Sequence, residues 1–245
     1  MPDMPVLREN RQQHRSADKR AILRDHYLFG KLTAQHIDRL SACIVSKSVK
    51  RGTSIFAKGD PGTSLFAIGA GTVKISVPSV EGKDAVFNVL GKGDIFGEFA
   101  LLDGHPRSAD ATAVTDCEMY VIERRDFLPV VREEPEIALR LIEILCSRLR
   151  RTTEQAAEVM FLDLPSRLAK ALMRLVDADT AGMRERKISI TQKDLGNIIG
   201  MSRESTNKQL RIWEDKKWVR LERNAVVILA IEPIAAIAEE GGAYG

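Results

Sequence analysis

The chain has 245 residues, of which 44% are hydrophobic and 29% charged, and its net charge is +3, as in an ordinary globular protein of one large or two smaller domains. No apolar run reaches the roughly 18 residues of a membrane-spanning helix, and the polar N-terminus lacks a secretory signal, so we expect a cytoplasmic protein with no membrane partner. Three widely spaced cysteines and four histidines without ligand spacing predict no metal site.

The N-terminal half begins with a polar stretch, residues 1–20, which predicts a flexible tail. The amphipathic sequence LTAQHIDRLSACI predicts a helix. Between Gly52 and Gly104 lie ten of the 17 glycines, which separate short β-type runs at intervals of roughly ten residues. Such strands, continued by ADATAV and EMYVIE, predict a β-sandwich or barrel, and we place this domain at residues 21–135.

The stretch FGEFALLDGHPRSADATA places a carboxylate, Glu98, and a guanidinium, Arg107, at the two ends of a short apolar turn. A helical turn at FALL would direct the free N–H groups of Phe99 and Ala100 at an anion, and Arg107 and Ser108 would complete the pocket. Because a carboxylate can accept a hydrogen bond from a sugar hydroxyl, the group fits a ribose beside a singly charged phosphate, as in a 3′,5′-cyclic nucleotide. The structural alternative is an internal Glu98–Arg107 ion pair.

Residues 136–162 predict one long helix, because the pattern is helical and contains no glycine or proline. Its apolar stripe has the alternating spacing of three and four residues that is typical of a coiled-coil seam. The stripe consists of Ile142, Leu145, Leu149, Thr152, Ala156 and Val159. We predict a homodimer through this helix, with one stripe of an internal core helix as the alternative. Thr152, with Thr153 beside it, puts a hydroxyl in the seam, where polar residues specify register or bind something.

Residues 163–245 predict a winged helix-turn-helix domain. Thr191 followed by Asp194 is typical of a capping box at the start of a helix, which Gly200 would end. Ser202 then caps a second helix that runs through RESTNKQLRIWED, and WVRLE and AVVIL follow as a two-stranded wing. Two short helices joined by a glycine-containing turn predict a helix-turn-helix.

The segment from Arg184 to Arg223 holds eleven basic and six acidic residues, which indicates either a polyanion partner or a solvated charged face. In a helix-turn-helix the second helix enters the major groove, where arginine can read guanine and glutamate can read cytosine. Groups at helix starts can hold phosphates. We therefore predict that double-stranded DNA is bound by Thr191, Gln192, Ser202, Arg203, Glu204 and Lys208. For three of these residues, Arg203, Glu204 and Lys208, the alternative is a surface salt-bridge cluster.

FGEFALLDGHPRSADATA resembles the phosphate-binding cassette of cyclic-nucleotide-binding domains, and with the long helix and GMSRESTNKQL the chain resembles the CRP/FNR family of bacterial transcription regulators. The resemblance covers residues 25–230. It implies an α+β fold with an N-terminal β-roll or jelly-roll nucleotide domain, a dimerisation helix and a C-terminal winged helix-turn-helix domain. It also implies a homodimer that binds cyclic nucleotide and palindromic promoter DNA and has no cofactor. The chain contains no P-loop, G-x-S-x-G or H-E-x-x-H motif, so we expect no enzyme.

The resemblance further implies which residues bind the nucleotide. Glu98 would bind the ribose 2′-hydroxyl, and the N–H groups after it, Arg107 and Ser108 would bind the cyclic phosphate. Thr152, with the partner subunit's Thr153, would meet the base. The full implied set is Gly97, Glu98, Phe99, Ala100, Arg107, Ser108, Arg148, Thr152 and Thr153.

Some residues depart from the family pattern or leave its details open. Lys208 stands where cAMP-responsive relatives carry arginine, and Thr206 and Gln209 occupy inward-leaning positions that are usually apolar. A threonine hydroxyl can serve adenine or guanine, so cAMP is the favoured effector and cGMP the second. A haem- or redox-sensing regulator on the same scaffold is the alternative function. By family analogy, the loop from Arg184 to Lys187 is expected to contact RNA polymerase.

Overall fold

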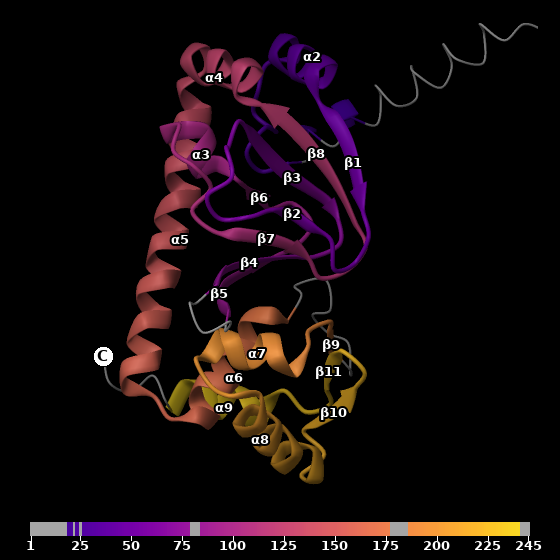
Figure 1. Cartoon of the computed structure of the whole chain (residues 1–245), viewed down its shortest axis with the longest axis vertical. Coiled ribbons are helices and arrows are strands. Elements are labelled where there is room, and N and C mark those ends of the chain that lie inside the picture. The colour runs from indigo at the N-terminus through magenta and orange to yellow at the C-terminus, as the bar shows by residue number, and fades with distance from the viewer. Residues whose placement is uncertain (1–18, 22, 25, 79–83, 177–185, 241–245) are drawn as a thin grey trace, which may run out of the picture. The chain divides into compact units, whose positions relative to one another are not determined.

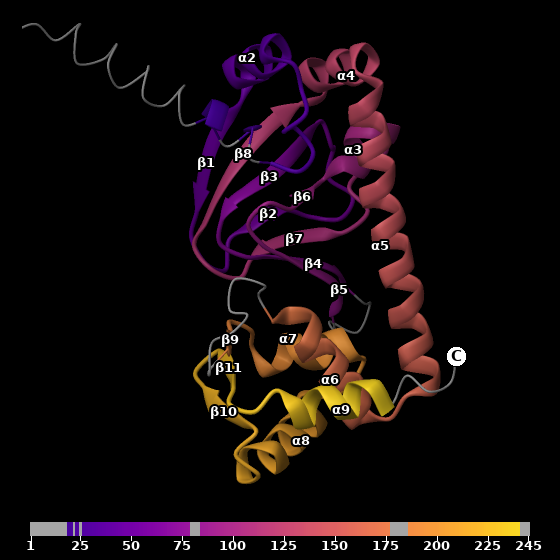
Figure 2. The same cartoon turned by 180° about the vertical axis from the view of Figure 1, so that it is seen from behind.

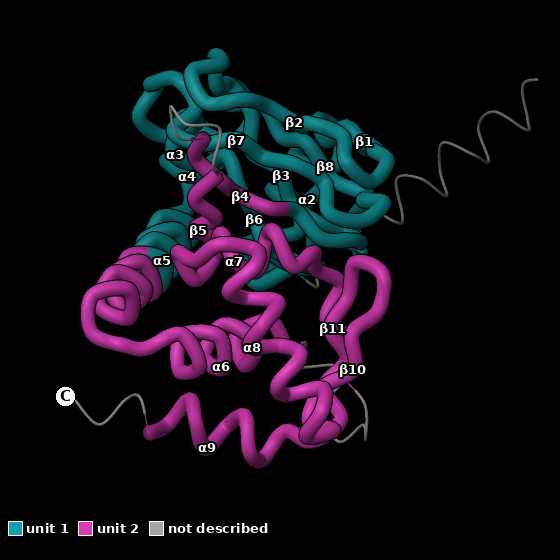
Figure 3. The backbone as a smooth tube through the Cα atoms, turned by 60° about the horizontal axis from the view of Figure 1, so that its bottom comes forward, with its two compact units in different colours: residues 1–73, 90–148 teal, residues 74–89, 149–245 magenta. Residues whose placement is uncertain are grey.

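The computed structural model describes residues 19–21, 23–24, 26–78, 84–176 and 186–240, which form helices and antiparallel sheets (Figures 1 and 2). The chain divides into two compact units, residues 1–73 with 90–148 and residues 74–89 with 149–245 (Figure 3). Of the predicted tail, residues 1–18 lie outside the described part. Among the described helices, none is both long and apolar enough to cross a membrane.

The first unit is built around an antiparallel sheet with the strand order β1-β8-β3-β6, visible in Figure 1. β2 and β7 pair antiparallel, with a shift in register after Ser54. The bounds are β1 Val45–Val49, β2 Ser54–Phe56, β3 Ser64–Ala70, β6 Ile95–Phe96, β7 Asp110–Ala113 and β8 Cys117–Glu123. The antiparallel strands confirm the predicted β-domain. Two strands were not predicted, because β1 is short and largely exposed and β6 has only two residues.

Helices cover the main sheet of this unit. α2 (Ala34–Cys43) is the helix predicted in LTAQHIDRLSACI, and the side chain of Thr33 caps it. α4 (Arg124–Glu133) was not predicted, since Pro129 and its charged residues interrupt the apolar period. Side chains from these helices and from the sheet form one buried core, which includes Phe29, Leu40, Leu65, Ile122, Phe127 and Val130.

α5 (Pro135–Phe161) is the predicted long helix, with 27 residues. Its predicted seam lies open in the described chain: Ile142 is 54% exposed, Leu149 68% and Val159 50%. Ile137 and Leu141 near its start are buried instead. The alternative of a core stripe is therefore wrong for these three seam residues, whereas Leu145 of the seam is half-buried.

The second unit contains β4 (Val73–Pro78) and β5 (Asp84–Leu90) except for Val73 and Leu90, together with a helical domain that has a three-stranded sheet of order β10-β11-β9. The remaining bounds are α6 Leu164–Leu175, β9 Arg186–Ile188, α7 Gln192–Ile199, α8 Arg203–Asp215, β10 Val219–Glu222, β11 Ala225–Ile228 and α9 Glu232–Glu240. α6 lies beside α9 in both views (Figures 1 and 2). The core includes Leu168, Leu172, Leu195, Leu210 and Trp213.

The wing has three strands where the sequence predicted two. Lys187, which was assigned to a loop, lies in β9 and pairs with Val227 of β11. A strand of only three residues, too short to show an alternating pattern, could not be distinguished from a loop. Residues 184 and 185 of the predicted loop lie outside the described part.

Candidate functional site

The predicted helical turn at FALL is α3 (Glu98–Asp103), and it begins because Gly97 adopts a left-handed conformation with φ of 80°. A Cβ added to Gly97 would lie 2.5 Å from Nη1 of Arg107, so a side chain has no room there. Glu98 at the first helical position is only 3% exposed. The turn therefore buries a carboxylate beside a guanidinium, as the spacing indicated.

Arg107 is 5% exposed, and backbone carbonyls hold its terminal nitrogens in place. Nη1 donates to the carbonyl of Gly97 at 2.8 Å, and Nη2 donates to that of Ser64 at 2.9 Å. The guanidinium also lies 4.3 Å from the ring centroid of Phe56 and 5.6 Å from that of Phe66. These contacts fix a cation in one orientation before any ligand arrives.

Nε of Arg107 is buried and has no hydrogen-bond partner in the described chain. It lies close to Gly62, where an added Cβ would be 3.1 Å from Nε and 2.1 Å from Cβ of Ala100. Burial lowers the pKa of the Arg107 guanidinium, while the nearby carboxylates of Glu98, Glu123 and Asp60 raise it. An arginine in this setting keeps its charge at neutral pH, so the turn holds a buried cation whose Nε has no hydrogen-bond partner among the described residues.

Glu98 forms its ion pair with Arg148 of α5 and, among the described residues, none with Arg107. Arg148 also donates to the carbonyl of Ile95. The alternative of a Glu98–Arg107 pair that closes the turn is therefore wrong. Glu98 instead connects the turn to the long helix, across 50 residues of sequence.

The other predicted nucleotide-binding residues lie at different depths. Ala100 is 3% exposed and Phe99 47%, while Ser108 is exposed beside the buried Arg107. Thr152 and Thr153 are exposed on α5 in the second compact unit, and the Thr153 hydroxyl donates to the carbonyl of Leu149 at 2.9 Å. The first unit brings the turn residues, Arg107 and Arg148 together, and the approach of the two threonines to the base stays a prediction.

Sequence reasoning missed the residues that support Arg107, namely Phe56, Gly62, Ser64 and Phe66. The GDPG stretch predicts a turn that includes Gly62, but no local sequence feature indicates that Ala100 lies against this glycine. These four positions are brought to the turn only by the tertiary fold.

The helix-turn-helix forms as its capping residues predicted. The hydroxyl of Thr191 accepts from the N–H of Asp194 at 3.0 Å, and that of Ser202 accepts from the N–H of Ser205 at 3.1 Å. Gly200 ends α7 in the left-handed conformation, with φ of 68°. A Cβ on Gly196 would lie 2.9 Å from the carbonyl oxygen of Met201, so the two helices cross closely there.

α8 divides into an inner and an outer face. Thr206, Leu210 and Trp213 point inward and are at most 1% exposed, and the Thr206 hydroxyl donates to the carbonyl of Ser202 at 2.9 Å. The inward position predicted for Thr206 is thus confirmed, and its polar group is satisfied locally.

The outer face of α8 presents Arg203, Glu204 and Lys208, all of them exposed. None of the three forms an ion pair with another described residue, so the predicted alternative of a salt-bridge cluster is wrong. Hydrogen bonds from its own backbone N–H and from Ser202 lower the pKa of Glu204. Glu204 therefore stays an acceptor at neutral pH, as reading a cytosine amine requires.

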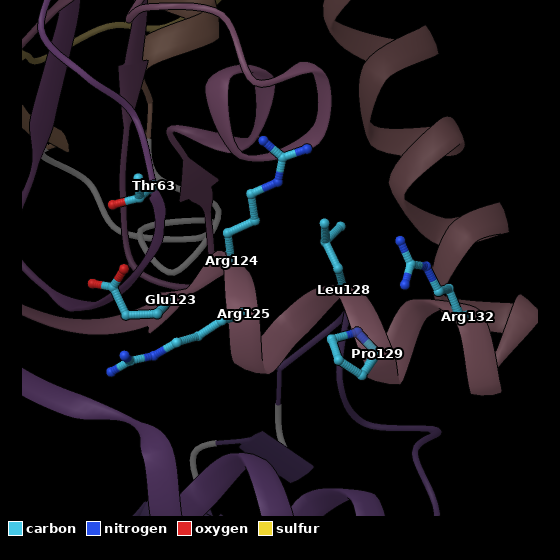
Figure 4. Close-up of a pocket in the computed structure, with 7 residues that line it drawn as sticks. All are labelled: Thr63, Glu123, Arg124, Arg125, Leu128, Pro129 and Arg132. Carbon is cyan, nitrogen blue, oxygen red and sulfur yellow. The ribbon is translucent and has the colours of Figure 1, made fainter.

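A separate pocket of about 610 Å³ lies beside the start of α4 and shares no residue with the nucleotide turn (Figure 4). Its lining includes the guanidinium groups of Arg124, Arg125 and Arg132, together with Glu123 and Leu128. Nη2 of Arg124 donates to the carbonyl of Leu102 at 3.4 Å. With three arginines and one glutamate in its lining, this surface is positively charged.

Two family models match the chain: the cyclic nucleotide-binding domain over residues 46–134 and the Crp-like helix-turn-helix domain over residues 166–237. The chain is 34% identical over 188 residues to the CRP-like cAMP-activated global transcriptional regulator of Mycobacterium tuberculosis H37Rv. This match covers 76% of this chain and 84% of the relative. It is 31% identical over 195 residues to the cAMP-activated global transcriptional regulator CRP of Escherichia coli O157:H7, covering 77% and 91%.

Among solved structures, the c-di-GMP responsive global regulator CLP of Xanthomonas campestris matches with a TM-score of 0.69. The match covers 80% of this chain and 99% of that chain at 23% identity. It shows a shared fold.

Proposed function

Because this chain belongs to the CRP/FNR family of transcription regulators, we propose that it acts as a homodimer whose effector is a cyclic nucleotide and whose target is palindromic promoter DNA. It is a DNA-binding regulator of transcription and not an enzyme. The observation that carries the proposal is the buried Arg107, held rigidly beside the start of α3 with one donor unsatisfied. A singly charged cyclic phosphate would satisfy that donor.

The polar groups of the turn divide between the two ends of such a ligand. The N–H groups of Phe99 and Ala100 at the start of α3, with Arg107 and Ser108, would bind the phosphate. Glu98 would accept from the ribose 2′-hydroxyl. Arg148 pairs with Glu98, so the nucleotide would have to share Glu98 with Arg148 or displace it.

The exposed seam of α5 supports the homodimer. Ile142, Leu149 and Val159 expose apolar side chains in the spacing of a coiled-coil stripe, and a second copy of α5 would cover them. Thr152 and Thr153 lie on the same stretch of helix, where they would meet the base. We favour cAMP, since both relatives described above are cAMP-activated, and cGMP is the second candidate.

Nucleotide binding at paired helices would favour the dimeric arrangement in which both α8 helices fit one DNA site. A ligand shifts such an equilibrium by its difference in affinity for the two states. The two recognition helices would then lie about 34 Å apart, the length of one helical turn of DNA. RNA polymerase is the further partner that we propose from family membership.

Isothermal titration calorimetry with cAMP and cGMP tests the effector assignment. We expect Arg107→Ala to weaken nucleotide binding at least 100-fold, because charge-assisted bonds of about 1.5–3 kcal/mol each are lost together. Arg125→Ala is the matched control, since the Arg125 side chain is 86% exposed and lies outside the nucleotide turn. Absent binding of both nucleotides, or equal binding to the Arg107→Ala variant, would contradict the assignment. A Soret band in the visible spectrum of the purified protein would favour the haem sensor.

A further inference from the structure

Arg167 of α6 contacts the turn that joins the two helices of the helix-turn-helix, all within the second compact unit (Figure 3). Its Nη1 donates to the carbonyl of Ile199 at 3.0 Å, and its Nη2 lies 3.3 Å from Sδ of Met201. Both terminal nitrogens of one guanidinium thus reach the end of α7 and the residue that follows it.

The end of α7 has a specific need for this cation. The N–H groups of Gly200 and Met201 both donate to the carbonyl of Gly196, which closes the turn. The carbonyl of Ile199 is among the last four of the helix, which have no partner within it, and the helix dipole places negative charge there. Arg167 supplies both the missing donor and the opposite charge, so it stabilises this particular geometry of the turn.

The turn geometry in turn sets where α8 begins. Met201 directly precedes Ser202, the N-cap of α8, and the carbonyl of Ser202 accepts from the N–H of Thr206 at 3.0 Å. Arg203 and Glu204 follow immediately on the outer face. A change in the position of Met201 therefore changes the position of both side chains, and base reading does not tolerate displacements of about 1 Å.

A direct contact between Arg167 and DNA does not fit its surroundings. Both terminal nitrogens are directed into the protein, and Nε of Arg167 is buried and has no hydrogen-bond partner among the residues that the structure describes. We propose that Arg167 is a positioning residue for sequence reading: it touches no DNA and holds the turn so that the first residues of α8 meet the base edges. The inference rests on the proposed DNA reading by α8.

The test compares Arg167→Met, Arg167→Lys and the control Lys170→Met, which removes a cation from the same helix one turn further on. Each variant is checked for thermal unfolding and then titrated onto two short duplexes with cAMP present. One duplex is selected by the wild-type protein from a random pool, and the other is its scrambled counterpart. Salt dependence is measured on the scrambled duplex.

We expect Arg167→Met to lower the ratio of the two affinities about tenfold, the size of losing one base contact. The salt slope on the scrambled duplex should not change, because no phosphate contact is removed. Arg167→Lys should give an intermediate ratio, since an amine cannot donate to both partners at once. Lys170→Met should keep the wild-type ratio.

A folded Arg167→Met protein with a ratio within about twofold of wild type would overturn the inference, given that one base contact is worth several-fold more. Equal losses on both duplexes with a smaller salt slope would overturn it too, because they would show a direct phosphate contact. If Arg167→Met does not fold, Arg167→Lys decides the question. An unchanged ratio of its affinities for the selected and the scrambled duplex would likewise overturn the inference.

A wild-type protein that selects no sequence would contradict the proposed function and not the role of Arg167 in the turn. Hydrogen exchange then decides that role. Faster exchange of the Gly200 and Met201 amides in Arg167→Met or Arg167→Lys than in Lys170→Met supports the inference, and equal exchange overturns it.

Discussion

The nucleotide turn and the outer face of α8 both present arginine and glutamate side chains, but they hold them in opposite ways. Arg107 and Glu98 are at most 5% exposed and are fixed by carbonyl groups, aromatic rings and Arg148. Arg203 and Glu204 are exposed and form no ion pair within the described chain. The difference follows from the ligand expected at each place. A small nucleotide must be desolvated by a preformed pocket, whereas a DNA duplex brings its own charged surface to an open one.

The largest effect that we expect concerns a buried polar group away from either site. His26 is 7% exposed in the first unit, and burial lowers its pKa to about 4. The folded chain therefore keeps His26 neutral, while the unfolded chain takes up a proton below about pH 6.5. The free energy of unfolding should fall by about 3 kcal/mol between pH 6.5 and pH 4.

Denaturant unfolding at a series of pH values measures this loss, and His26→Gln should remove most of it. Hydrogen exchange should locate the loss in the first unit, which contains the nucleotide turn, and not in the unit that contains α8. The same pH dependence in His26→Gln and in the wild type would show that His26 is not the source of the loss.

A second expected effect concerns the backbone that holds Arg107. Gly97→Ala must place a Cβ in the left-handed region and against Nη1 of Arg107, so we expect a loss of about 2–3 kcal/mol in unfolding free energy. Gly93→Ala is the control, since Gly93 has φ of 88° with open space around its Cβ position, and should cost about 1 kcal/mol. Equal costs in thermal unfolding would show that the pocket is less tightly packed than we describe.

The smallest expected effect concerns the open surface. Arg203→Ala should lower discrimination by about 1–3 kcal/mol for each guanine that it reads, and should leave thermal unfolding nearly unchanged because the side chain is exposed. Competition gel shifts with cognate and mutated duplexes measure it, and Arg211→Ala on the same helix is the control. An unchanged base preference in Arg203→Ala would assign sequence reading to other residues.

Local chemistry explains which parts of the molecule could be predicted from sequence. Thr191, Gly200 and Ser202 act within four residues of their partners, so the bounds of α7 and α8 followed from their identity alone. The turn at Gly97 was likewise predicted, because a glycine before a short apolar segment is a local signal.

Long-range contacts explain the rest. The ion pair of Glu98 with Arg148 and the contact of Arg167 with Met201 join residues 50 and 34 positions apart, and no periodicity encodes such pairs. α4 was missed because Pro129 and the surrounding charges mask its apolar face, which only packing against the sheet reveals.

The two faces of α8 also have a consequence for how such a protein can change over generations. Thr206, Leu210 and Trp213 fill the interior, and Gly196 lies close against Thr206, so almost any change there costs stability. The outer residues touch nothing in the described chain whose loss would unfold it. Under the proposed base reading, mutation of the outer residues can therefore change the target sequence without loss of stability, so descendants with a new DNA target need not arise from a poorly folded ancestor.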